Sequence, residues 1–517
     1  MDRPEPASSA KILISRRTAL KTVISGAVAG PLGCREVGEA EKSVERLRLS
    51  ALAGGRASSA CPMLVRGEAF GHPHSKRDGN AFPKTSVKET VDVAIIGGGP
   101  GGLSALHALR DRDVVLLEKE PQAGGNCSSD SWEGVRFSSG AAFFTEGDRE
   151  MVELMSSIGV PGQPIQGGDA LIVDGQPYLD FLGEGARRLP FALHVRDAFR
   201  SSSEAAAVLR RRHSSAELDY QPFSDFLRPY PAELRAFWDR FGASNWGATS
   251  EHTSARRGLG AYTWLNGEER RLSYPGGLGF AATALAGYLE RELPGRVRTS
   301  VFVHDLEVEA GGKSVLVHAL VGGEPHTIRA RKVIVAVPMF FAARLLPRVN
   351  AEQRAAMLAF RYAPYAVCNL CLDGVGPEPA YDNWFLDAPF ADFIPADWVT
   401  YAGNGPATRK TVLTVYHPLH ELERSKLLDD DHLVHMADEV VLRLDRYFPG
   451  LRKQVVETRV YRRGHALPMP TPGQLARAEL ASRTHGPIVF AHSDTRGDVS
   501  SFSGAMRAAR KAVAALG

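Results

Sequence analysis

The stretch VDVAIIGGGPGGLSAL, residues 91–106, predicts a strand, a glycine-rich turn and a helix in direct succession. Its first six residues form the mostly apolar run that is typical of a strand buried on both faces. Gly97, Gly99 and Gly102 then make the pattern GxGxxG, and Pro100 stands where a helix tolerates proline, in its first turn. Leucines recur at helical spacing after the turn. Together these features favour a Rossmann-type α/β unit.

A second strand, DVVLLE, follows and ends at Glu118. In such a unit Gly97 allows the tight turn, Gly99 lets the backbone approach a pyrophosphate, and Gly102 lets helix and strand pack closely. The N–H groups at the start of the helix attract the phosphates. Glu118 can accept hydrogen bonds from ribose hydroxyl groups, and it would repel the 2′-phosphate of NADP. We therefore predict a dinucleotide site, whose cofactor-binding residues also include Gly101 and Lys119.

The composition sets limits on the class of protein. The chain has 517 residues, of which 44% are hydrophobic, and this is enough for two domains that share a core. Its 62 basic and 59 acidic residues give a net charge of +3. Dedicated nucleic-acid binders concentrate basic charge, so this balance argues against one. No apolar run reaches the length that spans a bilayer, and we expect no transmembrane helix.

The first 34 residues resemble a bacterial export signal. ISRRTALK, residues 14–21, is a basic segment, and a short run of apolar and small residues follows it up to Cys34. The pair Arg16 and Arg17 resembles the twin-arginine signal. We therefore predict export by the twin-arginine route, as a periplasmic protein or a membrane-anchored lipoprotein. The alternative is a basic amphipathic helix on a protein that stays in the cytosol.

The end of this segment, PLGC, resembles a lipoprotein cleavage box in which Cys34 carries the lipid. Pro31 stands where that pattern has Leu, so a lipidated and an unlipidated Cys34 both stay open. Residues 35–90 are rich in Ser, Gly, Glu, Arg and Pro and show no clear periodicity. We predict that they form a tether or a loosely packed arm, and that the folded body begins near Val91.

Five cysteines are present, and Cys368 with Cys371 makes a CxxC pattern, which is common in metal and redox sites. Their surroundings, AVCNLCLD, alternate like a strand, and an offset of three places the two sulfur atoms on opposite faces. A second CxxC is missing from the sequence. We therefore predict two plain buried cysteines and no metal site.

A second glycine pair, Gly124 and Gly125, follows Glu118 in the segment KEPQAGGNCSSDSWEGVRFSSGAAFF. This order of acid, short loop and Gly-Gly resembles the superfamily of flavin-containing amine oxidases, protoporphyrinogen oxidases and phytoene desaturases. Asn126 stands where the superfamily commonly has Arg. Further segments that resemble the superfamily are SYPGGLGFAATALAGYLERE, TSVFVHDLEV, RARKVIVAVP, YRRGHALPMPTPG and PIVFAHSDTRGDVSSFSGAMRAARKAV.

The resemblance implies that the dinucleotide is FAD and that Gly124, Gly125 and Asn126 contribute to its site. It also places the backbone of Val303 against the adenine and Asp494 against the ribityl chain. The last helix would begin at Phe502 and Ser503, and its N-terminus would stabilise negative charge on the reduced flavin. No cysteine lies beyond Cys371, which excludes covalent attachment through a C-terminal cysteine. We therefore expect non-covalent FAD.

The resemblance also implies the domain organisation. A Rossmann-type FAD-binding domain, with a parallel sheet and helices, is expected from residues 91–145, 271–345 and 456–517. An inserted α+β substrate-binding domain is expected from residues 146–270 and 346–455. Apolar spacing indicates short helices in the first of these insertions, and strand-like runs occur in the second.

The sequence indicates the chemistry of the substrate side only in part. In amine oxidases, a Lys on the strand that corresponds to AVCNLCLD reaches the flavin through a water molecule, and here Asn369 or Cys368 takes that place. No Lys occurs between Phe360 and Thr408, and this argues against a simple amine oxidase.

Three other side chains are candidates for the active site. His465 could act as an acid or a base beside the flavin, because an ordinary His titrates near neutral pH. The alternative is a structural histidine in a loop. Trp384 and Phe385 are candidates for lining the substrate cavity, and the alternative for both is core packing.

These features lead to three hypotheses. The first is an FAD-dependent oxidoreductase that transfers a hydride from an amine or a carbon chain to N5 of the flavin. Its substrate would be a small molecule, and its electron acceptor would be O2 or a compound that the sequence does not indicate. The second is a non-redox flavoenzyme of the sugar-mutase kind. The third is an FAD-binding subunit that acts with a partner.

Overall fold

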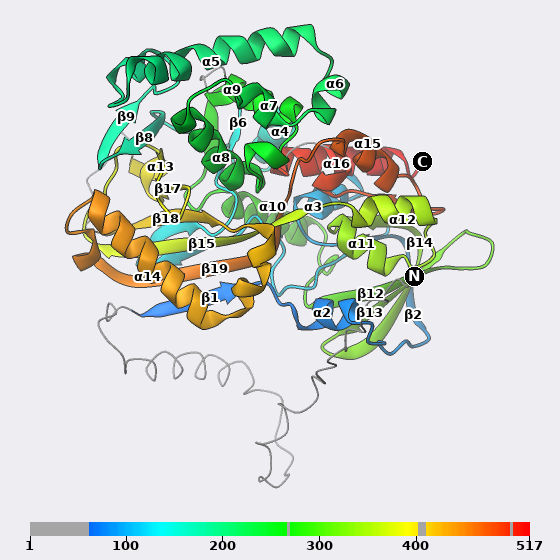
Figure 1. Cartoon of the computed structure of the whole chain (residues 1–517). Helices are drawn as coiled ribbons and strands as arrows, with labels where there is room; N and C mark the ends of the chain where they lie inside the picture. Colours follow the sequence, from blue (N-terminus) through cyan, green and yellow to red (C-terminus); the bar gives the residue numbers. More distant parts are fainter. Residues whose placement is uncertain (1–61, 266–268, 402–409, 497–499) are drawn as a thin grey trace, which may run out of the picture. The chain divides into compact units, whose positions relative to one another are not determined.

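The structure is a computed structural model that describes residues 62–265, 269–401, 410–496 and 500–517. The expected export signal at residues 1–34 and the first part of the expected arm lie outside the described residues. Within the described ranges, no helix combines the length and the apolar character that crossing a membrane requires. Two large sheets with helices packed on them, and two small sheets, make up the folded part (Figure 1).

The first large sheet contains the glycine-rich turn. Its strands in spatial order are β11 (Val297–Arg298), β3 (Val114–Leu117), β2 (Val87–Ile96), β14 (Glu324–Val335), β13 (Val315–Val321) and β12 (Val301–Val308). A further strand, β20 (Ile488–Phe490), pairs with the end of β14. Strands β11, β3, β2, β14 and β20 pair in parallel, whereas β12, β13 and β14 form an antiparallel meander.

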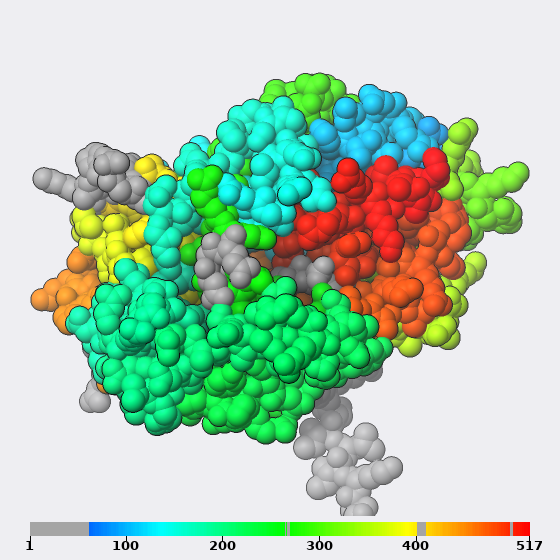
Figure 2. Space-filling model, turned by 90° about the horizontal axis from the view of Figure 1, so that it is seen from above, coloured from blue at the N-terminus to red at the C-terminus, as the bar shows by residue number. Residues whose placement is uncertain are grey.

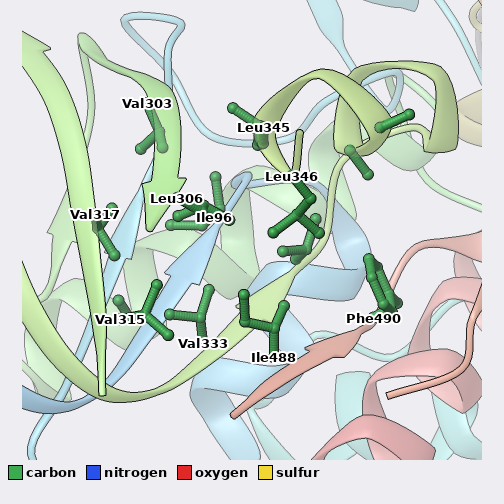
Figure 3. Close-up of a cluster of buried hydrophobic side chains, with 14 of the residues drawn as sticks. Ile96, Val303, Leu306, Val315, Val317, Val333, Leu345, Leu346, Ile488 and Phe490 are labelled. Carbon is green, nitrogen blue, oxygen red and sulfur yellow. The ribbon is translucent and has the colours of Figure 1, made fainter. Parts of the chain in front are cut away.

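Strand β2 is buried on both faces because its apolar side chains alternate between two hydrophobic cores. Val93 and Ile95 belong to a core with helices α3 (Pro100–Ala108), α4 (Arg149–Ser157), α10 (Leu278–Glu292) and α16 (Phe502–Ala514). Ala94 and Ile96 belong to a core with the meander and helices α11 (Met339–Leu345), α12 (Ala351–Leu358) and α15 (Gln474–Ala481) (Figure 3). The predicted Rossmann-type α/β fold is therefore confirmed.

The second large sheet is mostly antiparallel. Its strands in spatial order are β1 (Met63–Gly67), β19 (Val455–Pro468), β15 (Tyr362–Asp373), β18 (Lys410–Pro418), β17 (Asp392–Pro395), β16 (Asp382–Phe385), β8 (Asp169–Val173) and β9 (Gln176–Leu179). The long helix α14 (Asp430–Tyr447) lies across β15 and β19 (Figure 1). It presents its buried leucines and valines to the sheet and keeps its charged residues on the outer side.

A group of helices packs beside the second sheet around an aromatic core. These helices are α5 (Leu193–Arg212), α6 (Ser215–Tyr220), α7 (Phe223–Leu227), α8 (Ala232–Trp246) and α9 (Ala255–Leu265). Phe199, Phe237, Trp238, Phe241 and Trp246 are fully buried between them. The small elements that complete the fold are α2 (Gly71–Arg77), α13 (Trp398–Tyr401), the hairpin of β4 (Ser129–Trp132) and β5 (Val135–Ser138), and the sheet of β6 (Phe143–Thr145), β10 (Arg271–Ser273) and β7 (Gln163–Pro164).

Two sequence expectations about organisation need correction. The arm expected over residues 35–90 contains β1 and α2, and β1 pairs in parallel with β19 from Met63 to Gly67. An edge strand exposes unpaired backbone groups, and β1 satisfies those of β19 although its own sequence carries little signal. Residues 456–517 were expected to belong entirely to the FAD-binding domain, yet β19 lies in the second sheet between β1 and β15.

The two cysteines of the CxxC pattern lie on β15 as expected. Cys368 pairs with Val415 and Cys371 pairs with Val412, so their side chains point to opposite faces of the sheet. Both residues are fully buried and form no disulfide. Burial raises the pKa of each thiol to about 12, which keeps both protonated at neutral pH. The prediction of plain buried cysteines is confirmed.

Candidate cofactor and active site

The turn between β2 and α3 has the geometry that the glycine pattern predicts. Gly97 has a φ of +104°, a backbone conformation that L side chains rarely adopt. A Cβ on Gly102 would lie 1.9 Å from the carbonyl oxygen of Gly97, and a Cβ on Gly101 would lie 2.2 Å from that of Ala491. These glycines are therefore required for the close packing of α3 against its neighbours, as predicted for Gly102.

Gly99 differs because the space beside it is open. The nearest atom to a Cβ built there is the Cα of Gly125, 3.9 Å away. Gly125 has a φ of +58°, and its Cα lies against Gly99. Gly124 has no room for a side chain, because its Cβ would lie 2.7 Å from the carbonyl oxygen of Cys127. Two glycine segments thus meet at the N-terminus of α3. This Cβ-free cradle fits the diphosphate of a dinucleotide.

Glu118 follows β3, as expected, and is buried. Its Oε2 accepts a hydrogen bond of 2.5 Å from the N–H of Gly98, and its Oε1 accepts one of 2.8 Å from the N–H of Glu120. Burial raises the pKa of the carboxyl group. Sequence reasoning missed Gly98, whose Cβ would lie 2.9 Å from the Cβ of Glu118. Lys119 forms an ion pair with Glu120. Contact of Glu118 or Lys119 with a ribose stays a prediction.

Asn126 connects the glycine cradle to the second sheet. Its Nδ2 donates to the carbonyl oxygen of Ala466 at 2.6 Å, and its Oδ1 accepts from Nη1 of Arg463 at 3.2 Å. Arg463 is buried on β19 and also donates to the hydroxyl of Ser128. Sequence reasoning missed Arg463, although a charged residue inside the strand-like run YRRGHALP was a signal for a buried interaction.

Val303 is buried on the edge strand β12, and the pairing with β13 is irregular between Val303 and Asp305. The N–H of Val301, two residues earlier, donates to the carbonyl oxygen of Glu118 at 2.8 Å. The start of β12 therefore lies at the end of β3, beside the acid. This placement suits a cofactor that extends from the cradle along Glu118, and the adenine contact of Val303 stays a prediction.

Asp494 is completely buried near the start of the C-terminal segment. Its Oδ2 accepts hydrogen bonds from the N–H of Met339, at 3.1 Å, and from the hydroxyl of Tyr362. Its Oδ1 lies 2.8 Å from Nδ1 of His492. Sequence reasoning missed Tyr362, since it lies on β15, far from Asp494 in the chain. Contact between Asp494 and a ribityl chain stays a prediction.

Helix α16 begins at Phe502, as predicted, and Ser501 caps it by accepting from the N–H of Gly504 at 2.9 Å. The hydroxyl of Ser503 is buried and has no hydrogen-bond partner among the described residues. An unpaired polar atom at a helix N-terminus suits a polar ligand atom. Helices α16 and α3 are neighbours, because a Cβ on Gly101 would lie 3.7 Å from the carbonyl oxygen of Ala505.

His465 lies on β19 and stacks on Phe340 with a centroid distance of 4.2 Å. Burial, followed by the charges of Arg424 and Arg344, lowers the pKa of the imidazole to about 3. The side chain is therefore neutral at physiological pH. A group with such a pKa is a poor acid and a poor base at neutral pH, which argues against the acid–base role that the sequence suggested.

Trp384 and Phe385 lie on opposite faces of β16, and both are fully buried. Trp384 packs against Phe241, with a centroid distance of 5.0 Å, inside the aromatic core of the helices. Phe385 packs against Tyr447 at 4.9 Å, on the side of α14. These contacts are those of core packing, and a contact of either residue with substrate stays a prediction.

The second sheet presents a polar face toward the segment after the second glycine pair. Residues at alternate positions share this face, and in register order they are Arg463 on β19, Tyr365 and Asn369 on β15, Thr414 and Tyr416 on β18, Asp392 on β17 and Asp382 on β16. The hydroxyl of Tyr416 donates to the carbonyl oxygen of Gly140 at 3.0 Å. Sequence reasoning missed this face because the residues come from five strands.

Figure 2 shows the teal and green helical segments and the red C-terminal segment on the same face of the molecule. The candidate site thus combines a glycine cradle, the N-termini of α3 and α16 and the polar face of the second sheet. Together these features fit a dinucleotide cofactor with a reactive end that meets a substrate.

A comparison with known families agrees with this arrangement. The sequence profile described as flavin containing amine oxidoreductase matches residues 101–517. The chain belongs to the flavin-containing amine oxidoreductase family. Membership places it among the flavin-dependent oxidoreductases, as the resemblance of the glycine and C-terminal segments implied.

Solved structures with the same fold include amine oxidases. Putrescine oxidase bound to putrescine has a TM-score of 0.63 and 18% identity, over 84% of this chain and 99% of that one. Cyclohexylamine oxidase from Brevibacterium oxydans has a TM-score of 0.62 and 19% identity, over 82% and 98%. At such identities the likeness shows the fold of the family and not the substrate.

A shorter likeness connects this chain to a desaturase of carbon chains. The carotenoid 3,4-desaturase of Haloarcula japonica is 47% identical over 55 residues, which are 10% of this chain and 11% of that protein. The chain thus spans only a small part of the length of this curated relative. These comparisons thus include amine oxidases among the solved structures and a carotenoid desaturase among the curated relatives.

Proposed function

We propose that this protein binds FAD non-covalently and oxidises a small molecule, an amine or a carbon chain, by transferring a hydride to the flavin. The observation that carries this proposal is the open space beside Gly99, which faces Gly125 at the N-terminus of α3. When bound, FAD supplies the hydride acceptor. Gly99, with Gly125 against it, would leave room for its diphosphate, and Gly97, Gly101, Gly102 and Gly124 would let the surrounding backbone pack closely. Glu118, Val303 and Asp494 would meet its other parts.

The residues of this chain would position the substrate and would stabilise the negative charge that develops on the cofactor. The N-terminus of α16 carries the partial positive charge that stabilises a nearby anion, and the hydroxyl of Ser503 lies there without a partner among the described residues. On the second sheet, Tyr365 and Tyr416 form an edge-to-face pair with centroids 6.2 Å apart. Such a wall of aromatic side chains can orient either an amine or an unsaturated chain.

An anaerobic titration of the purified protein tests the proposal. Amines and polyene chains are added separately, and the visible absorption band of the flavin is followed. A substrate of the proposed class bleaches this band without any other reductant. The Gly99→Ala variant, with its cradle filled, serves as the control that lacks bound FAD.

Other outcomes would contradict the proposal in distinguishable ways. A protein that is folded and monodisperse but colourless, and that takes up no FAD when offered it, removes the cofactor assignment. Turnover only after chemical reduction of the flavin, with no net oxidation, indicates a mutase. Bleaching only after a second protein is added indicates an FAD-binding subunit that acts with a partner.

We also propose that the protein is exported by the twin-arginine route. The support is the sequence alone: Arg16 and Arg17, the short apolar run and the cleavage-like end at Cys34. That route carries folded proteins, which agrees with a cofactor inserted before export. Cell fractionation of a variant with Arg16→Lys and Arg17→Lys tests this, since the variant should stay in the cytoplasm. Metabolic labelling with a fatty acid tests lipidation of Cys34.

A further inference from the structure

The segment before the glycine-rich domain runs from the edge of the second sheet toward the edge of the first. Strand β1 is the edge strand of the second sheet, and α2 lies beside the meander of the first sheet (Figure 1). We call residues 67–74, from the end of β1 into α2, the strap. Most of its residues are exposed, and no residue of α2 is buried. Such a segment is ordered through its contacts with other elements, so these contacts indicate its role.

The first contact of the strap is with the second sheet. Gly67 pairs with Arg462, and a Cβ on Gly67 would lie 2.7 Å from the carbonyl oxygen of Arg462. Oε1 of Glu68 lies 3.7 Å from Nη1 of Arg463, and the same Nη1 donates to Oδ1 of Asn126. Because Asn126 directly follows the second glycine pair, Arg463 connects the start of the strap to the glycine cradle.

The second contact is with the segment after β3. The N–H of Ala69 donates to Oε1 of Glu120 at 3.0 Å. The same oxygen forms the ion pair with Lys119, and the N–H of Glu120 donates to Oε1 of Glu118. Glu118 and Lys119 are the residues predicted to meet a ribose. The hydrogen bond from Ala69 therefore holds the middle of the strap beside the predicted ribose site.

The third contact is with β12. The ring of His72 stacks on the ring of Phe302, with centroids 5.1 Å apart and 20° between the planes. Phe82, which follows α2, packs against the same ring at 5.5 Å. Phe302 directly precedes Val303, whose backbone is predicted to meet the adenine. The end of the strap is thus fixed beside the predicted adenine site.

The three contacts follow the order of the parts of the cofactor, from the diphosphate through the ribose to the adenine. The strap also keeps aromatic surface exposed at this place, since Phe70 is 41% exposed although it packs against Arg462 and His74. Aromatic side chains suit a flat heterocycle such as adenine. The competing role is a brace that joins the two sheets and touches no ligand.

We propose that the strap is a third part of the FAD site, which covers the adenosine half of bound FAD and moves away before FAD is released. This inference rests on the proposed function, including its placement of Glu118 and Val303. It adds binding residues that lie before the glycine-rich turn in the chain, with His72 and Phe70 beside the adenine. The ligand class that the strap recognises is an adenine nucleotide, and FMN, which lacks the adenosine half, should not sense it.

The release of FAD from the purified holoprotein tests the proposal. The protein is diluted, and the rise of flavin fluorescence gives the rate constant. Ala69→Pro removes the N–H that holds the strap beside the predicted ribose site, and His72→Ala removes the stacked ring. His72→Phe keeps a ring that can stack. Asn80→Ala, an exposed residue after α2 whose side chain donates to the hydroxyl of Ser75, is the matched control.

We expect Ala69→Pro and His72→Ala to release FAD about tenfold faster, because the loss of a contact acts mainly on the dissociation rate. His72→Phe and the control should change the rate by less than about twofold. Thermal unfolding of the same proteins without FAD should be unchanged, because exposed positions are substituted. Release at the parent rate from both strap variants overturns the proposal. A loss of stability without FAD in step with faster release also overturns it, in favour of a brace.

Two smaller ligands show which half of the cofactor the strap covers. ADP contains the adenosine half and FMN contains the flavin half, and equilibrium dialysis measures their binding to the full chain after FAD is removed. The two strap variants should weaken ADP about tenfold and leave FMN within about twofold. Equal weakening of both ligands, or weakening of FMN alone, overturns the proposal.

These results separate failure of the strap from failure of the proposed function. If the parent protein holds FAD and the strap variants release it at the parent rate, the strap is wrong and the cofactor assignment stands. If the variants release FAD faster but no substrate bleaches the flavin, the oxidation is wrong and the strap stands. A parent protein that takes up no FAD removes both.

Discussion

The two large sheets contribute to the candidate site in opposite ways. The first sheet and its helices present bare backbone, since Gly97, Gly102 and Gly125 let backbone segments pack closely and Gly99 leaves open space. The second sheet presents side chains, and Arg463 and Tyr416 project from its strands toward the segment after the second glycine pair. The first sheet thus offers a ligand bare backbone, and the second sheet offers it polar side chains.

Because of this difference, the glycine cradle and the polar face of the second sheet tolerate different substitutions. In the glycine cradle, the methyl group of an alanine would meet either backbone atoms or the space of the ligand. A Gly→Ala substitution, although small, should therefore have a large effect on folding or on cofactor binding. On the polar face, a side chain can be replaced by one of the same shape, and the effect depends on the hydrogen bonds that it leaves unpaired. Substitutions at both kinds of position test this difference.

The largest effect is expected from Gly102→Ala. Its Cβ would lie 1.9 Å from the carbonyl oxygen of Gly97, and neither backbone can move without distorting β2 or α3. We expect a loss of about 3 kcal/mol or more in unfolding free energy, with little soluble protein. Denaturant unfolding measures the loss, and Gly260→Ala, a helical position with no atom within 4 Å of the new Cβ, should be close to neutral. A stable Gly102→Ala protein with normal flavin would contradict the packing argument.

Gly99→Ala should separate folding from cofactor binding. The new Cβ has open space, with its nearest neighbour 3.9 Å away, so the stability of the protein without cofactor should change by less than about 1 kcal/mol. The methyl group would occupy the place of the diphosphate, and FAD affinity should fall by about a hundredfold or more. Thermal unfolding and equilibrium dialysis with FAD measure the two quantities. Unchanged FAD affinity would show that the diphosphate lies elsewhere.

Arg463→Met tests the polar face of the second sheet. The change keeps most of the length but removes the donor of Oδ1 of Asn126 and one of the two side-chain partners of the Ser128 hydroxyl. We expect a loss of about 1–3 kcal/mol in unfolding free energy, with FAD still bound. Arg462→Met, on the opposite face of the same strand, removes a partly exposed pair with Asp430 and should cost less. Equal losses in both variants would remove the distinction between the two faces.

The smallest effect is a pH dependence from His465. Its pKa is about 3 in the folded protein, below the ordinary value near 6.5, so the folded state binds fewer protons than the unfolded state in this range. Its contribution to stability is present above about pH 6.5 and is lost as the pH falls toward 3, by about 1.5 kcal/mol between pH 6.5 and pH 5. His465→Phe, which can stack on Phe340, should reduce this loss. Unfolding curves at both pH values measure it, and identical pH profiles would contradict the assignment.

Local patterns were enough to predict the parts of the site that are contiguous in the chain. The strand before Gly97, the helix from Pro100, the acid at Glu118, the glycine pair at 124–125 and the helix from Phe502 all lie where the sequence placed them. Each depends on backbone conformation or on neighbours within a few residues. The failures involve pairing between distant segments: β1 completes the edge of β19, and Tyr362 reaches Asp494 from β15.

The sequence by itself determined the α/β fold of the first sheet and the glycine cradle, because turn geometry and helix starts are local properties of the chain. Only the tertiary structure decided the polar face, the low pKa of His465 and the burial of Asp382 and Asp392. These depend on which strands become neighbours and on how much water they exclude. The pairing of β16 with β17 brings Asp382 and Asp392, 10 positions apart in the sequence, onto neighbouring strands, and burial raises the pKa of both carboxyl groups.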